Sequence, residues 1–125
     1  MNSKEIIILL RKIDEGYCLS EQELEQLSSI KAIEYELYDE LPKSIYLLKN
    51  LKKLDLHLNT PVCFRPIVPE SMYLPNAIGS LKHLEVLNLS NTFIHKLPEV
   101  IGGAINLRYL SIKNTKITEI GRAHV

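Results

Sequence analysis

Residues 74–98, LPNAIGSLKHLEVLNLSNTFIHKLP, contain a pattern that occurs in two other places in the chain. It begins with Leu-Pro, continues with apolar residues three or four positions apart, and ends in Leu-x-x-Leu-x-Leu, with Ile112 in the last position of the third copy. Leu87 and Leu89 alternate with other residues, which predicts a short strand with one buried face. The apolar spacing before that strand predicts one or two helical turns.

Three units align at the same offsets, beginning at Leu41, Leu74 and Leu97. The steps between them are 33 and 23 residues, so the first unit carries an insertion of ten. One unit cannot bury its own apolar side, but stacked units can. We therefore predict an α/β, right-handed solenoid with parallel strands on its concave face. A turn ladder, in which side chains hydrogen-bond the backbone after each strand, is expected at Asn59, Thr92 and Thr115.

These units resemble the 23-residue leucine-rich repeats of intracellular proteins. Residues 74–98 are most similar to repeats of plant disease-resistance receptors and Ras-suppressor-like proteins, and the resemblance covers residues 41 to about 120. It implies a curved solenoid that binds partners on its concave sheet. No GxxxxGK[ST] phosphate loop occurs, so the nucleotide-binding domain of the plant receptors is missing, and bacterial repeat proteins are an equally good source.

Residues 1–40 do not follow the repeat and are interpreted as an N-terminal helical cap. A first amphipathic helix is expected from about Lys4 to Ile13, ending near Gly16. Ser20 and Glu23 form a capping box that predicts the start of a second helix. Residues 33–37 alternate apolar and acidic side chains, as a degenerate first strand does. The alternative is a separate helical interaction module.

The three repeats are expected to occupy residues 41–119, with the insertion at about residues 61–73. The insertion contains three prolines, which exclude regular structure, and many apolar residues. Packing against the solenoid is favoured over a hydrophobic contact surface. Residues 120–125, IGRAHV, look like a translated sequencing adapter, which predicts a non-native tail on a C-terminally truncated chain. The edge formed by Leu107, Leu110 and Ile112 would then allow self-association.

The composition bounds the function. The chain has 15 Lys and Arg against 15 Asp and Glu, so no net field attracts nucleic acid or an acidic membrane. The apolar run from Ile6 to Leu10 is too short for a signal peptide or a membrane span. Cys18 and Cys63 lack a disulfide or metal pattern. We expect a cytoplasmic protein with a protein partner, no nucleic acid or membrane partner, and no cofactor.

The candidate binding residues are the strand positions that face away from the leucine core. An apolar anchor at Val86 and Tyr109 with polar neighbours suits protein recognition better than a small-molecule pocket. The alternative is that each position is merely solvated, because few interface residues carry binding energy. The predicted concave-face set is Lys53, Asp55, His57, Val86, Asn88, Ser90, Tyr109, Ser111 and Lys113.

No catalytic or metal site is predicted. His57 and Cys63 are close in sequence, but nothing near them lowers a thiol pKa or supplies an orienting group. The four histidines lack HxxxH spacing. We expect a protein–protein interaction module and no enzyme. The alternative is the sensor or effector repeat region of a larger signalling or ubiquitin-ligase-type protein whose catalytic domain is missing.

Overall fold

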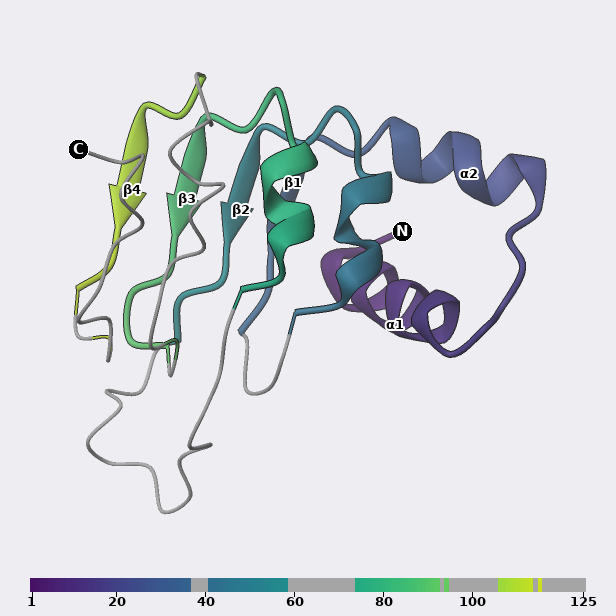
Figure 1. The fold of residues 1–125 in the computed structure, drawn as a ribbon, viewed down its shortest axis with the longest axis horizontal. Helices are drawn as coiled ribbons and strands as arrows, with labels where there is room; N and C mark the ends of the chain where they lie inside the picture. The colour runs from purple at the N-terminus through teal and green to yellow at the C-terminus, as the bar shows by residue number, and fades with distance from the viewer. Residues whose placement is uncertain (37–40, 59–73, 93, 95–105, 114, 116–125) are drawn as a thin grey trace, which may run out of the picture.

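The computed structural model describes residues 1–36, 41–58, 74–92, 94, 106–113 and 115. Two helices lie at one end of the molecule, and a row of short strands with single helical turns continues from them (Figure 1). In chain order the elements are α1 Ser3–Asp14, α2 Glu21–Ser28, β1 Ala32–Glu34, the 3₁₀ turn η1 Lys43–Leu47, β2 Lys53–Asp55, the 3₁₀ turn η3 Asn76–Ser80, β3 Val86–Asn88 and β4 Tyr109–Ser111.

The strands form one parallel sheet in the order β1-β2-β3-β4. Lys53 pairs with Val86, 33 residues later, and Val86 pairs with Tyr109, 23 residues later. These are the steps between the sequence units, so each unit contributes one strand in register with the next. The structure therefore confirms the predicted α/β solenoid with parallel strands.

The core runs along the sheet on one of its faces. Leu54 and Leu87 pair in register and are fully buried, as are Leu56 and Leu89 two residues later. Burial of one such leucine contributes about 2 kcal/mol of transfer free energy, so the repeated register is a large source of stability. The helical turns expected before the strands are single 3₁₀ turns, and each follows a proline, Pro42 or Pro75, whose fixed φ suits the entry to a tight turn.

Local signals explain the ends of α1. Asn2 and Glu5 form a capping box, so the helix begins at Ser3, one residue before the expected start. It ends at Asp14, and Gly16, two residues later, has a φ of 111°, in the left-handed region where a side chain would be strained. The N–H of Tyr17 donates to the carbonyl of Lys12 at 2.9 Å, which completes a Schellman ending.

The capping box expected at the start of α2 is confirmed: Ser20 and Glu23 exchange hydrogen bonds at the first turn. No helix in the described ranges is both long and apolar enough to cross a bilayer.

Side chains of α1 connect it to the repeats. The Asp14 carboxylate accepts hydrogen bonds from the backbone N–H groups of Lys43 (2.9 Å) and Ser44 (3.0 Å) at the start of η1. The buried Ser44 hydroxyl donates to the Leu10 carbonyl at 2.7 Å. The bond gives the buried Ser44 hydroxyl a partner and joins α1 to the start of η1. Helix α1 is thus fixed to the first repeat by polar bonds as well as by its apolar face.

Candidate functional site

Six of the nine predicted concave-face residues lie in the strands, on the sheet face that points away from the leucine core. The strand register aligns Lys53, Val86 and Tyr109 in one row, and Asp55, Asn88 and Ser111 in the next. His57, Ser90 and Lys113 follow two residues later, beyond the strand ends. We call this surface the open face. Strand β1 extends it with Ala32 and Glu34, which pair in register with Lys53 and Asp55.

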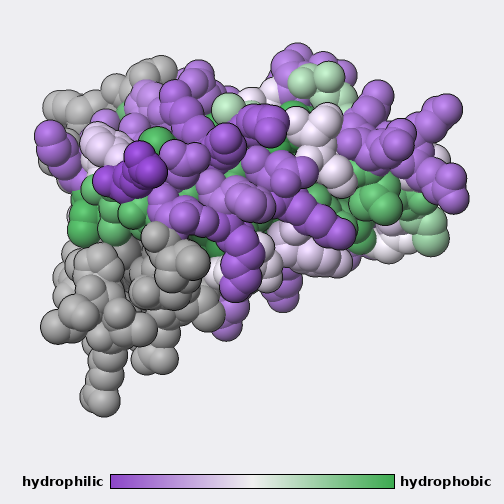
Figure 2. All heavy atoms as spheres, turned by 90° about the horizontal axis from the view of Figure 1, so that it is seen from above, coloured by the Kyte–Doolittle hydropathy of each residue, from purple (hydrophilic) through white to green (hydrophobic). Residues whose placement is uncertain are grey.

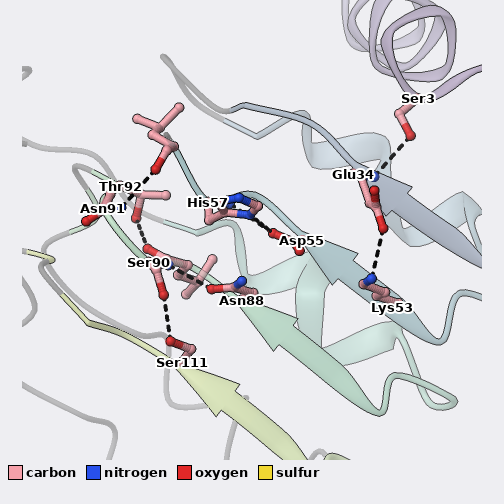
Figure 3. A network of polar contacts seen from close by, with 12 residues as sticks. Ser3, Glu34, Lys53, Asp55, His57, Asn88, Ser90, Asn91, Thr92 and Ser111 are labelled. Atoms are coloured by element: carbon pink, nitrogen blue, oxygen red, sulfur yellow. Dashed lines mark hydrogen bonds and ion pairs between the residues drawn. The ribbon is translucent and has the colours of Figure 1, made fainter. Parts of the chain in front are cut away.

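Two side chains of the middle row, Asp55 and Asn88, close the turns that follow their strands. Asp55 Oδ1 accepts the backbone N–H of His57 at 3.2 Å, and Asn88 Oδ1 accepts that of Ser90 at 3.1 Å (Figure 3). These are the same side-chain-to-backbone bonds across two residues, in consecutive repeats. His57 Nδ1 also contacts Asp55 Oδ1. Asp55 and Asn88 therefore shape the chain after each strand and have less capacity left for a partner.

Two further contacts link neighbouring strands across the open face. The hydroxyls of Ser90 and Ser111 lie 2.6 Å apart. Lys53 Nζ forms an ion pair with Glu34 Oε1 at 2.8 Å, and this hydrogen bond and charge raise the pKa of Lys53 above its ordinary value of 10.5. Both side chains of the pair are largely in water, so it contributes little to stability.

Val86 and Tyr109 remain as an apolar pair on adjacent strands. The Tyr109 side chain is 53% exposed, the highest value among the exposed large hydrophobic residues of the described sequence, and Val86 is half-buried beside it. Within the described ranges, the side chains of Tyr109 and Lys113 make no hydrogen bond or ion pair. These three residues are the part of the predicted set that the fold itself leaves unused.

The turn ladder lies beside the open face. Thr92 is buried and its hydroxyl donates to the Leu89 carbonyl at 2.7 Å, while the Thr115 hydroxyl donates to the Ile112 carbonyl at 2.8 Å. Asn59, the third predicted member, lies outside the described residues.

Asparagines that were not predicted from the sequence also hold the repeats together. Asn91 has a φ of 64°, a conformation that asparagine tolerates, and its Nδ2 donates to the Leu58 carbonyl of the preceding repeat at 2.9 Å. Asn50 donates to the Ser28 carbonyl at 2.6 Å, and Asn106 to the Lys82 carbonyl at 2.7 Å. The sequence carries a hint of the second pair, since Asn50 and Asn106 each precede the first leucine of Leu-x-x-Leu-x-Leu.

The described residues contain no group of three or more His, Cys, Asp or Glu side chains arranged to hold a metal ion. Cys18 is an exposed free thiol. Cys63, and with it the insertion at residues 61–73, lies outside the described ranges, as do residues 120–125.

Comparison with known proteins supports the repeat register. A family model described as Leucine Rich repeats (2 copies) matches residues 82–123. The structure of a leucine-rich-repeat protein from Leptospira interrogans is similar over 84% of this chain, with a TM-score of 0.64 and 33% sequence identity. This chain spans 24% of the length of that protein. No curated protein matches the sequence. With its strands in register at the repeat spacing, the chain carries leucine-rich repeats folded as a leucine-rich-repeat solenoid.

Proposed function

We propose that the chain is a protein-interaction module that binds a partner protein through the open face of its sheet. The observation that carries this proposal is the adjacent pair Val86 and Tyr109, a half-buried aliphatic and an exposed aromatic side chain beside one another on paired strands. Leucine-rich-repeat domains typically bind other proteins through such extended surfaces. Tyrosine is enriched among residues that dominate binding energy because it buries a large rigid ring and keeps a polar hydroxyl.

The residues of the open face fall into two groups, those that bond other residues of the chain and those that are available to a partner, and this supports a specific recognition site. Asp55 and Asn88 hold the turns, and Lys53 is neutralised by Glu34, so these residues position the surface. Val86 and Tyr109 supply the apolar anchor, and the exposed Lys113, just beyond the end of β4, supplies a cation. A partner that fits carries an apolar side chain for the anchor and a carboxylate for Lys113.

We infer that residues 1–40 form the cap expected at the start of such a solenoid. Helix α1 lies at the β1 end of the sheet (Figure 1), and its Ser3 hydroxyl accepts the backbone N–H of Glu34 at 3.0 Å. The buried α1 residues Ile7 and Leu10 continue the apolar core of the repeats. A cap of this kind keeps the end of the core and the sheet edge out of water.

The experiment is a selection of peptides from a random displayed library on the immobilised chain, followed by affinity measurements on variants. Tyr109→Ala should weaken most selected peptides by about thirtyfold, the effect of losing a dominant interface side chain. Tyr46→Ala is the matched control, because Tyr46 is 49% exposed and lies on η1, away from the open face. Peptides that lose affinity through Tyr46 and not through Tyr109 would place binding on the other side of the solenoid and refute the proposal.

A further inference from the structure

The two edges of the sheet differ in how their outward backbone groups are satisfied. At β1, the N–H of Glu34 points away from β2 and donates to the Ser3 hydroxyl of α1 at 3.0 Å. This contact blocks the β1 edge, since an added strand would have to displace the helix.

At the β4 edge, the Thr115 hydroxyl donates to the Ile112 carbonyl at 2.8 Å, which leaves that oxygen one further lone pair, and within the described ranges the N–H groups of Leu110 and Ile112 have no such contact. Tyr109 N donates to Glu85 O, and the carbonyls of Ser111 and Lys113 accept from Leu89 and Asn91, so these three residues direct their backbone groups toward β3. Because backbone direction alternates along a strand, the N–H and C=O groups of Leu110 and Ile112 point outward. The edge therefore offers a ladder of donors and acceptors to another strand.

The side chains at this edge are also less covered than their counterparts. Leu84, Leu87 and Leu89 of the preceding repeat are at most 1% exposed. Leu107, Leu110 and Ile112 occupy the same repeat positions and are only partly buried. Hydrophobic atoms are visible at the left end of the molecule in Figure 2, the end at which β4 lies in Figure 1. An unpaired, apolar strand edge of this kind is a template for association.

We propose that β4 pairs antiparallel with β4 of a second copy of this chain, across a two-fold axis at Ser111. In that register Leu110 lies opposite Ile112 of the second copy and exchanges both N–H···O bonds with it. The core sides of the two sheets then meet apolar against apolar. On the open face, Tyr109 lies opposite Lys113 of the second copy, which places a cation beside an aromatic ring, and Ser111 lies opposite Ser111.

The register follows from the side chains of β4 itself. Centring the axis on Leu110 would place Ile112 opposite Arg108, and centring it on Ile112 would place Ser111 opposite Lys113. Either choice sets an apolar or small side chain against a charged one, so the Ser111 register is the complementary one. A second copy fits better than a head-to-tail array, because the β1 edge that such an array needs is blocked by Ser3. The arrangement joins two open faces into one continuous surface.

Disulfide trapping tests the register directly. Residues directly opposite at a non-hydrogen-bonded antiparallel pair have Cα atoms about 4.5 Å apart, within the range of a disulfide. In a background with Cys18→Ser and Cys63→Ser, Ser111→Cys should therefore give a covalent dimer on mild oxidation. Lys113→Cys is the matched control, because the two copies of residue 113 would be separated by about 13 Å along the strands. Equal crosslinking of both variants, or crosslinking of the control alone, would overturn the proposal.

A charge exchange gives an independent test by analytical ultracentrifugation. Tyr109→Lys creates two symmetry-related Lys–Lys pairs and should weaken the dimer by about tenfold or more, while adding Lys113→Glu should restore it to within about threefold. Val86→Lys places the same charge one strand inside the edge and should leave the dimer unchanged. Ile112→Pro removes an outward N–H without removing a bond to β3, and should abolish the dimer while the circular dichroism spectrum is retained.

A wild-type chain that stays monomeric up to about 1 mM overturns the edge pairing, as does a dimer that Tyr109→Lys and Ile112→Pro leave intact. Either result leaves partner binding untouched, because that binding is measured on single chains with peptides. Conversely, Val86 variants that lose peptide binding but still dimerise would show that the peptide-binding surface and the dimer interface are distinct.

Discussion

The leucines in register across the sheet predict a graded loss of stability. Leu54, Leu87 and Leu110 occupy the same repeat position in β2, β3 and β4, and they pair with one another in order. Leu54 and Leu87 are fully buried, whereas Leu110 is only partly buried. Truncation to alanine removes the same atoms at each position, so any difference in the free energy of unfolding reports the surroundings alone.

The magnitudes follow from burial. Leu87→Ala leaves a cavity in the core beneath the sheet, between Leu54 and Leu110, that cannot collapse without shifting the sheet, and should cost about 4 kcal/mol, near the upper part of the range for buried leucines. Leu54→Ala should cost a similar amount. Leu110→Ala should cost about 2 kcal/mol, because part of that side chain already contacts water. Ile8→Ala, at a 45% exposed position on α1, is the control and should cost about 0.5 kcal/mol.

The assay is urea unfolding followed by far-UV circular dichroism, at low protein concentration so that association does not add to the measured stability. With a slope of about 2 kcal/mol per molar urea, Leu87→Ala should lower the midpoint by about 2 M and Leu110→Ala by about 1 M. Equal losses for Leu87→Ala and Leu110→Ala would refute the reasoning, because they would mean that β4 is as well covered as the centre of the sheet.

Two further predictions concern the N-terminal helices. Asp14→Ala should lower the free energy of unfolding by about 1.5 kcal/mol, because it removes the acceptor of two backbone N–H groups at the start of η1, while Glu15→Ala, an exposed neighbour, should change it by less than about 0.5 kcal/mol in the same urea assay. The backbone N–H of the α2 N-cap and then the Tyr17 hydroxyl hold the pKa of Glu23 below its ordinary value of 4.5, so the capping bond stabilises the fold above that pH and is lost as pH falls through the lowered pKa. Tyr17→Phe should move the pKa of Glu23 upward but not past 4.5 in a carbon-detected NMR titration, and an unchanged pKa would contradict the role given to the hydroxyl.

The repeat period made the sheet predictable from sequence. A leucine at a fixed offset in every unit, such as Leu54 and Leu87, can be buried only if the units stack in register, so the spacing alone specifies strand order and pairing. The contacts of α1 with the repeats could not be derived in this way. Asp14 and Ser44 belong to no repeated pattern, and the bond between them depends on how α1 packs beside the first repeat.

The sequence predicts which residues lie on the open face, but not which of them bond the local backbone and which are available to a partner. Alternation along each strand places Asp55, Asn88 and Tyr109 on one side of the sheet, because successive side chains point to opposite faces. Whether such a side chain binds a partner or the local backbone depends on the turn that follows the strand. That turn geometry is a property of the folded chain, so alternation alone does not distinguish Asp55, which bonds the local backbone, from Tyr109, which does not.

This difference between the rows of the open face has a physical basis, which a comparison of the repeats shows. The row Asp55, Asn88 and Ser111 contains short polar side chains at every position, which are the residue types that hydrogen-bond nearby backbone. The row Lys53, Val86 and Tyr109 mixes a cation, an aliphatic and an aromatic side chain, so no common structural demand acts on it. In a solenoid every repeat must close the same turn, and a position that serves the turn is restricted in each unit. A position free of that demand can vary from unit to unit, and it is there that a partner can be recognised.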